Sequence, residues 1–181
     1  GNQGIKRFIS RKNFRNPVFE DAVWGVSDQD LLYRANQEFE EANKHGPFFA
    51  AVLTVSNHAP FLLPSPLPFE RINNKGAENA RFNSVRYADW ALGQFIEQAR
   101  TMDYFDNTLF AFVGDHGIIG ATGPHLPPAW RELAITQGHT PFLVYAPGHV
   151  TPRRVDHWAQ QVDVLPTLAS LAGIGYRNTT L

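Results

Sequence analysis

The stretch "LFAFVGDHG", residues 109–117, places five apolar or aromatic residues directly before Gly114 and the pair Asp115–His116. A continuous apolar run that ends at a glycine is typical of a strand buried on both faces of a sheet. Carboxylate and imidazole groups are common metal ligands and acid–base groups. The stretch therefore indicates an α/β sheet with chemically active side chains at the end of a strand.

Similar patterns continue in both directions from this stretch. We expect two more buried strands, at "FFAAVLTVSNH" (48–58) and at "TPFLVYAPG" (140–148). Apolar residues at helical spacing predict three helices: one from an N-cap at Ser27 to Gly46, one over 80–103, and one over 161–173 with Gly173 as its C-terminal cap. The Gly/Pro-rich segments 59–76 and 118–139 are predicted loops, the second of them long enough to be functional.

The alternation of strands and helices predicts the fold class. Unbroken apolar strands separated by amphipathic helices are typical of an α/β fold in three layers, a mostly parallel sheet with helices on both faces. The sequence has 181 residues and shows neither an internal repeat nor an interior linker. We therefore expect residues 1–181 to belong to one domain.

Composition excludes several classes of function. The net charge of −1 gives no reason to expect a nucleic-acid partner. The absence of cysteine excludes a disulfide framework, a thiolate zinc site and a cysteine nucleophile within these residues. No run of about 18 apolar residues is present, so as it stands the chain is predicted to be soluble.

Three of the seven histidines adjoin the ends of predicted strands. His58 ends the strand at 48–58, His116 follows Asp115, and His139 immediately precedes the strand at 140–148. Ligands of open α/β sheets bind just outside the carboxyl ends of the strands. Mixed oxygen and nitrogen ligation by Asp115 and His116 suits Mn²⁺ or Zn²⁺ better than Ca²⁺, although a complete site needs further ligands.

Each candidate also has a structural interpretation. An Asp–His pair after a strand is often a helix cap with a solvated imidazole. For His58, a loop histidine hydrogen-bonded to the backbone is the more common case, and a histidine before a Thr-Pro, as at His139, is more often a turn residue than a ligand. Spacing alone leaves these interpretations open.

Several motifs in order resemble a known family: "LTVSNHAPF" (53–61), "FVGDHG" (112–117), "GHTPFLVYAPG" (138–148) and "QVDVLPTLASLAGI" (161–174). Together they are similar to the C-terminal half of the sulfatase-like domain of the alkaline phosphatase superfamily. With "RYADWALGQFIEQARTMDYFDNTLFAFVGDHG" (86–117), they most resemble its lipoteichoic acid synthase and phosphoglycerol transferase branch. The resemblance covers roughly residues 48 to 175 and implies the partial alkaline phosphatase-like fold.

The resemblance implies a role for each candidate residue. Asp115 and His116 match the pair that ligates the catalytic metal, for which Mn²⁺ is expected, with Zn²⁺, Mg²⁺ and Ca²⁺ as alternatives. His58 matches a catalytic histidine that contacts the phosphate or protonates the leaving oxygen. His139 matches a position that binds substrate or a second metal in some relatives and varies in others.

The nucleophile expected from the resemblance has no match in this sequence. Family members have a Thr, Ser or modified Cys at the start of a helix near the N-terminus of the domain, and an acidic metal ligand from the first strand. Neither motif occurs here. We therefore expect residues 1–181 to be the C-terminal portion of one sulfatase-like catalytic domain, inactive when tested alone.

The implied activity is metal-dependent transfer of phosphoglycerol, or a related phosphoryl group, from lipid- or glycan-linked phosphodiesters through a covalent intermediate. Two alternatives are a sulfate- or phosphate-ester hydrolase and a non-catalytic ligand-binding fragment. The resemblance places the intact protein on the extracytoplasmic face of a bacterial cytoplasmic membrane, attached through segments absent here. The sequence does not indicate an oligomeric state.

Overall fold

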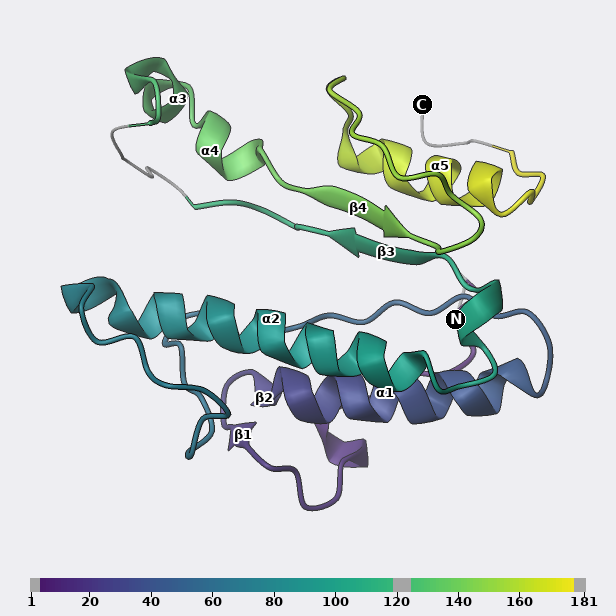
Figure 1. The fold of residues 1–181 in the computed structure, drawn as a ribbon, viewed down its shortest axis with the longest axis horizontal. Coiled ribbons are helices and arrows are strands. Elements are labelled where there is room, and N and C mark those ends of the chain that lie inside the picture. The colour runs from purple at the N-terminus through teal and green to yellow at the C-terminus, as the bar shows by residue number, and fades with distance from the viewer. Residues whose placement is uncertain (1–3, 119–124, 178–181) are drawn as a thin grey trace. The chain divides into compact units, whose positions relative to one another are not determined.

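The computed structural model describes residues 4–118 and 125–177, which divide into two compact units, Gly1–Phe105 and Asp106–Leu181 (Figure 1). The helices are α1 (Asp28–Asn43), α2 (Asn79–Ala99), α3 (Pro128–Glu132), α4 (Ile135–Gly138) and α5 (Val164–Leu171). The strands are β1 (Glu20–Asp21), β2 (Gly25–Val26), β3 (Phe110–Val113) and β4 (Phe142–Tyr145). Short 3-10 turns are η1 (Arg11–Asn13), η2 (Gly76–Glu78), η3 (Phe105–Asn107) and η4 (Gln161–Asp163).

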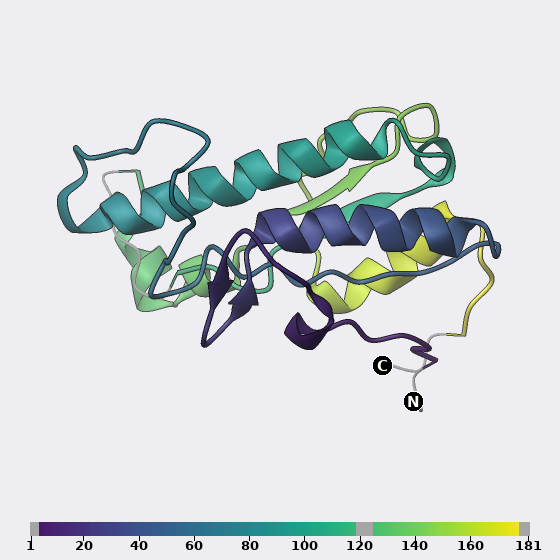
Figure 2. The ribbon, with the colours of Figure 1, turned by 90° about the horizontal axis from the view of Figure 1, so that it is seen from below.

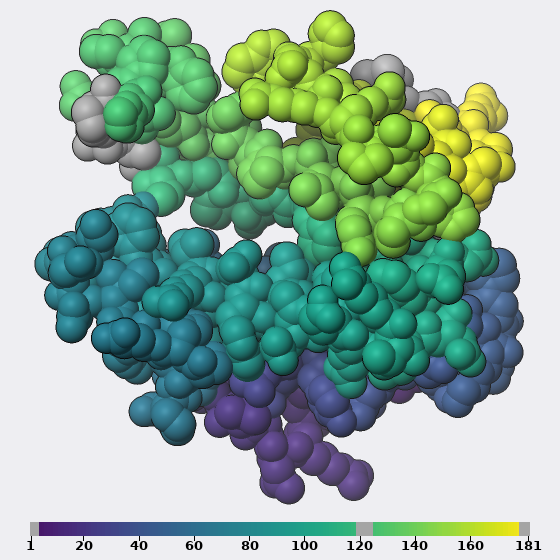
Figure 3. All heavy atoms as spheres, viewed as in Figure 1, coloured from purple at the N-terminus to yellow at the C-terminus, as the bar shows by residue number. Residues whose placement is uncertain are grey.

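The first unit is built on the packing of α1 against α2, which run side by side in Figures 1 and 2. Phe39 of α1 meets Phe95 of α2 edge to face, with 6.3 Å between ring centroids. Asn36 is fully buried, and its amide donates to the Phe95 carbonyl oxygen at 3.2 Å and to the Gln98 side chain at 2.9 Å. A satisfied buried amide fixes the register of the two helices. Figure 3 draws the heavy atoms of this unit as spheres, coloured from purple to teal.

The two predicted long helices are confirmed. Ser27 is the N-cap of α1, and its Oγ accepts the Asp30 amide hydrogen at 3.3 Å. The helix ends at Asn43, shortly before Gly46, whose φ of +114° suits glycine. The predicted 80–103 helix is α2, which ends at Ala99.

The strand expected at 48–58 does not form. Residues 48–55 have no regular secondary structure, and Phe49 and Leu53 are about three-quarters exposed (74% and 75%). A strand exists through hydrogen bonds to a neighbour and is buried only if other surfaces cover it. Within residues 4–118 and 125–177, no segment pairs with 48–55. The predicted strand, buried on both faces, is therefore wrong for these residues.

The second unit contains the β3–β4 pair, which runs antiparallel with Phe110 opposite Tyr145 and Val113 opposite Phe142. This corrects the mostly parallel arrangement expected for the described strands, since β1 and β2 are also antiparallel. Mixed α/β sheets often include such antiparallel strands. Gly173 follows α5 with a φ of +67°, as predicted for its C-terminal cap.

None of the helices described over residues 4–118 and 125–177 combines the length and apolar character needed to cross a bilayer.

Candidate functional site

Asp115 and His116 follow β3 after one intervening residue, Gly114, and their side chains face each other. The ladder continues one residue past β3, because the Gly114 amide donates to the Pro141 carbonyl oxygen at 3.0 Å. Asp115 then turns back so that its Oδ1 accepts the amide hydrogen of His116 at 2.8 Å. Its Oδ2 lies 3.7 Å from His116 Nε2, and both side chains are more than half exposed. The expected pair is therefore assembled locally, with two donor atoms open to solvent.

The imidazole of His116 has a defined tautomer. Its Nδ1 lies 2.9 Å from the carbonyl oxygen of Gly117. Because a carbonyl oxygen can only accept, Nδ1 is the donor, and in the neutral ring the lone pair is then on Nε2. Metal-bound histidines commonly have this arrangement, in which the second ring nitrogen donates to a carbonyl.

This donor pair fits a divalent metal ion. Carboxylate oxygen and imidazole nitrogen bind such ions at about 2.1 Å, so two ligands of one ion lie at most about 4.2 Å apart. The observed 3.7 Å separation between Asp115 Oδ2 and His116 Nε2 lies within that limit. Over residues 4–118 and 125–177, no group of three or more His, Cys, Asp or Glu side chains could hold a metal ion. Asp115 and His116 could thus supply two ligands of a set that other groups must complete.

The glycines on either side of the pair are needed for close packing. Neither Gly114 nor Gly117 has a positive φ, so backbone handedness does not explain them. A Cβ on Gly117 would lie 2.1 Å from the Thr136 carbonyl oxygen, and one on Gly114 would lie 3.0 Å from Thr140 Cβ. These glycines therefore let the loop approach the segment before β4.

Gln161, in η4, holds the same loop from the other direction. Its Nε2 donates to the carbonyl oxygens of Gly114 at 2.9 Å and Asp115 at 2.7 Å. One amide group therefore fixes the two peptide units that aim the Asp115 side chain. The motif "QVDVLPT" was recognised in the sequence, but no role for its glutamine was predicted from it.

His58 lies in the first unit, in a turn that both long helices hold. Asp28 of α1 is buried, and its Oδ1 accepts the amide hydrogens of Val55 at 2.8 Å and Ser56 at 3.0 Å. Ser56 Oγ in return accepts the Asp28 amide hydrogen at 3.0 Å. From α2, the hydroxyl of Ser84 donates to the Asn57 side chain at 2.9 Å. These bonds fix the backbone immediately before His58.

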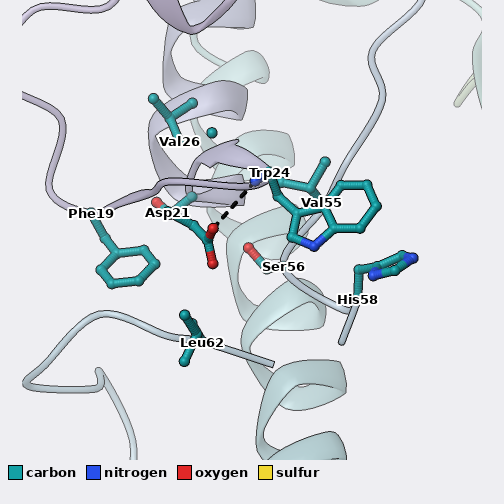
Figure 4. Close-up of a pocket in the computed structure, with 10 residues that line it drawn as sticks. Phe19, Asp21, Trp24, Val26, Val55, Ser56, His58 and Leu62 are labelled. Carbon is teal, nitrogen blue, oxygen red and sulfur yellow. Dashed lines mark hydrogen bonds between the residues drawn. The ribbon is translucent and has the colours of Figure 1, made fainter. Parts of the chain in front are cut away.

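The imidazole of His58 lies beside the indole of Trp24 at the rim of a shallow hollow (Figure 4). Their ring centroids are 3.8 Å apart. His58 Nδ1 lies 2.9 Å from the Ala59 carbonyl oxygen, so Nδ1 donates and Nε2 is the free nitrogen. The hollow has a volume of about 10 Å³, and its lining includes Asp21, Ser27 and Ser56. Nδ1 therefore makes the backbone hydrogen bond expected of a loop histidine, while Nε2 stays available for chemistry.

His139 lies between two tryptophans. Its ring centroid is 5.4 Å from that of Trp130 and 5.5 Å from that of Trp158. Its backbone amide donates to the Ile135 carbonyl oxygen at 2.9 Å and closes α4, which agrees with a turn residue. Its role as a substrate or second-metal ligand stays a prediction.

Comparison with known proteins identifies the family. The sulfatase family profile matches residues 1–174. The chain belongs to the sulfatase family. It is 28% identical to the lipoteichoic acid synthase-like protein YvgJ of Bacillus subtilis, over 94% of this chain and 29% of that protein. It is also 28% identical to the lipoteichoic acid synthase of Staphylococcus aureus, over 92% of this chain and 28% of that protein.

Solved structures agree with the family and the fold. An alkaline phosphatase superfamily protein from Vibrio parahaemolyticus matches with a TM-score of 0.76 and 36% identity, over 94% of this chain and 39% of that one. The lipoteichoic acid synthase LtaP of Listeria monocytogenes matches with a TM-score of 0.80 and 26% identity, over 97% of this chain and 45% of that one. These matches confirm the partial α/β fold of the alkaline phosphatase superfamily. The chain spans less than a third of the length of the relatives from Bacillus subtilis and Staphylococcus aureus.

Proposed function

We propose that the protein is a metal-dependent transferase of phosphoglycerol or a related phosphoryl group, acting on lipid- or glycan-linked phosphodiesters through a covalent intermediate. The observation that carries the proposal is the Asp115–His116 pair, with Oδ2 and Nε2 3.7 Å apart at the end of β3 in a sulfatase-family chain. Two relatives named as lipoteichoic acid synthase or synthase-like favour transfer to another alcohol.

The residues of the candidate site have distinct tasks in this proposal. Asp115 and His116 would hold the divalent ion, Mn²⁺ by preference, which supplies Lewis-acid stabilisation of charge on phosphoryl oxygens. Gly117 and Gln161 keep those two ligands in place through backbone contacts. His58 would present Nε2 to an oxygen of the substrate, either to orient the phosphate or to protonate the departing alkoxide. The attacking hydroxyl belongs to none of these residues.

The deciding experiment replaces Asp115 by Asn in the full-length protein. Asparagine keeps the size of the side chain but removes its charge, so we expect Mn²⁺ affinity in calorimetry to fall and transfer from a fluorescent phosphoglycerol lipid to be lost. Normal turnover by the variant would contradict the proposal. The metal titration gives a readout that does not depend on knowing the natural substrate.

A hydrolase of sulfate or phosphate esters is the second candidate, favoured by the sulfatase family match itself. The two activities differ in the acceptor: an alcohol for the transferase and water for the hydrolase. Product analysis with and without added glycerol separates them, because a transferase makes a new diester and a hydrolase releases the free acid. Location at the extracytoplasmic face of the membrane belongs to the same proposal, since a lipid-linked substrate must be reached at a membrane surface.

A further inference from the structure

We infer that Trp24 is a positioning residue for His58, holding the imidazole so that Nε2 is the nitrogen presented to substrate. This inference rests on the proposed role of His58 in phosphoryl transfer. Trp24 is 41% exposed, so packing in the core does not account for where its ring lies.

The two rings are joined in two ways. The centroids lie 3.8 Å apart with 43° between the ring planes, which is direct contact. The Trp24 Nε1–H donates to the Ala59 carbonyl oxygen at 2.9 Å, the same oxygen that accepts from His58 Nδ1 at 2.9 Å. With both lone pairs of that oxygen used, the carbonyl is fixed in direction and so is the imidazole that donates to it.

Trp24 is itself held by a short hairpin. Asp21 Oδ1 accepts the amide hydrogen of Trp24 at 3.3 Å (Figure 4) and that of Val23 at 2.5 Å. Asp21 also pairs with Gly25 across the β1–β2 ladder. Gly25 has a φ of +105°, which favours glycine immediately after Trp24. The hairpin thus ends in a rigid turn that places the indole against His58.

The start of the hairpin is fixed to α1. Asp30 accepts the amide hydrogens of Val18 at 2.8 Å and Phe19 at 3.2 Å, and it also accepts the hydroxyl of the N-cap Ser27 at 2.7 Å. The same helix end holds Val55 and Ser56 through Asp28. One helix N-terminus therefore supports both partners of the ring contact, as pre-organisation of a reacting group requires.

The alternative is that Trp24 only fills the hollow that it lines. A filling role predicts a loss of stability that is independent of His58. A positioning role predicts a loss of turnover that exists only while His58 is present. A double-mutant cycle distinguishes these outcomes, because it measures whether the two substitutions act through each other.

The experiment compares Trp24→Ala, Trp24→Phe, His58→Ala and the Trp24→Ala/His58→Ala double variant in the full-length protein. A displaced catalytic group can lower turnover by about 10- to 100-fold. We expect Trp24→Ala to lower kcat by about this factor with little change in KM, and to have no further effect once His58 is alanine. Trp24→Phe keeps an aromatic ring, so it should retain more activity than Trp24→Ala and serve as the variant that folds normally. Trp90→Ala, which removes an indole packed on Tyr87, is the matched control for loss of a tryptophan.

Proton NMR of the His58 ring tests the contact between Trp24 and His58 without an activity assay. An indole 3.8 Å away should shift the His58 Cε1 proton upfield, and Trp24→Ala should return it toward the free value. The inference is overturned if Trp24→Ala lowers kcat equally with and without His58, or if the ring proton does not move. Should those results occur while Asp115→Asn is inactive, the proposed function stands and only the role of Trp24 is lost. An active Asp115→Asn variant would instead remove the proposed function.

Discussion

Gly117 shows how strongly a single residue constrains the candidate metal loop. A methyl group there would lie 2.1 Å from the Thr136 carbonyl oxygen, a separation that requires the backbone to move. The Gly117 amide also donates to the Gln137 carbonyl oxygen at 2.7 Å, and the Gly117 carbonyl accepts from His116. A displaced Gly117 would therefore disturb the hydrogen bond that sets the His116 tautomer.

We predict that Gly117→Ala weakens Mn²⁺ binding by about tenfold or more, as expected for loss of an outer-shell partner of a metal ligand. Gly138→Ala is the matched control, because a Cβ on Gly138 meets nothing within 4 Å. Isothermal titration with Mn²⁺ measures both variants. Equal affinities for the two would show that the close contact at Gly117 does not shape the site.

Gln161 gives a second test at this scale. Gln161→Glu places carboxylate oxygens against the two carbonyl oxygens that now accept from Nε2, so it replaces attraction by repulsion. We expect Mn²⁺ affinity to fall by about 10- to 100-fold, and Gln161→Ala to have a smaller effect. The order of these two variants is the informative result: a larger loss in Gln161→Ala would mean that the amide does not act through the carbonyl groups.

The residues of the site differ in how far sequence could reveal them. The closeness of Asp115 and His116 was predictable because the two residues are adjacent in sequence at the end of a predicted strand, while their role as metal ligands stays a prediction. Gln161 and Trp24 were missed because their hydrogen-bond partners are distant in sequence. Gly114 lies 47 positions from Gln161, and Ala59 lies 35 positions from Trp24. A hydrogen bond between distant residues depends on the folded backbone, and neither residue type signals its partner.

At the scale of elements, the N-terminus of α1 organises the surroundings of His58. Asp28 is 1% exposed, and its Oδ1 accepts two backbone hydrogens from the segment 55–56. The sequence predicted the N-cap at Ser27 but gave no indication of this second use of the first helical turn. A carboxylate at that position is also favoured by the helix dipole.

We predict that Asp28→Ala lowers the free energy of unfolding by about 1–3 kcal/mol, because two buried amide groups lose their acceptor. Asp28→Asn keeps an oxygen for them and should be less harmful. Urea unfolding followed by circular dichroism measures both variants, with exposed Asp89→Ala on α2 as the control. If Asp28→Ala were as stable as that control, the contact between α1 and 55–56 would not be important for the fold.

At the scale of the whole molecule, the three predicted helices formed, whereas one of the three predicted strands did not, and the short helices α3 and α4 lie in a segment that was predicted to be a loop. A helix satisfies its own backbone and leaves a periodic trace in sequence, so α1, α2 and α5 were found with small errors at their ends. The apolar run 48–55 has strand-forming residues, yet Phe49 and Leu53 are exposed and no described segment pairs with it within residues 4–118 and 125–177. The relative direction of the strands was predicted wrongly for the same reason. It depends on which strand is the partner, and sequence periodicity does not identify the partner.

The stability of the first unit should depend on alkaline pH through Tyr104. Burial raises the pKa of the Tyr104 phenol well above its ordinary value, and the nearby Glu40 charge raises it further. The phenol donates to Asn36 Oδ1, which lies in the network that joins α1 to α2. The pKa of the phenol is higher in the folded protein than its unfolded value of about 10. The neutral phenol therefore contributes fully to stability below about pH 10, and this contribution is lost as the pH rises toward the folded pKa.

We therefore predict that unfolding in urea becomes easier as the pH rises above about 10, and that Tyr104→Phe makes this dependence weaker. At neutral pH the same substitution should cost about 1–2 kcal/mol, since Asn36 Oδ1 loses a buried donor. Tyr33, which is 55% exposed on α1, is the matched control, because Tyr33→Phe removes a phenol that water already solvates. Urea midpoints between neutral pH and the alkaline range test the idea directly. An unchanged pH slope in Tyr104→Phe would mean that another buried group governs the alkaline stability, with Tyr87, whose pKa is also raised by burial, as the next to replace.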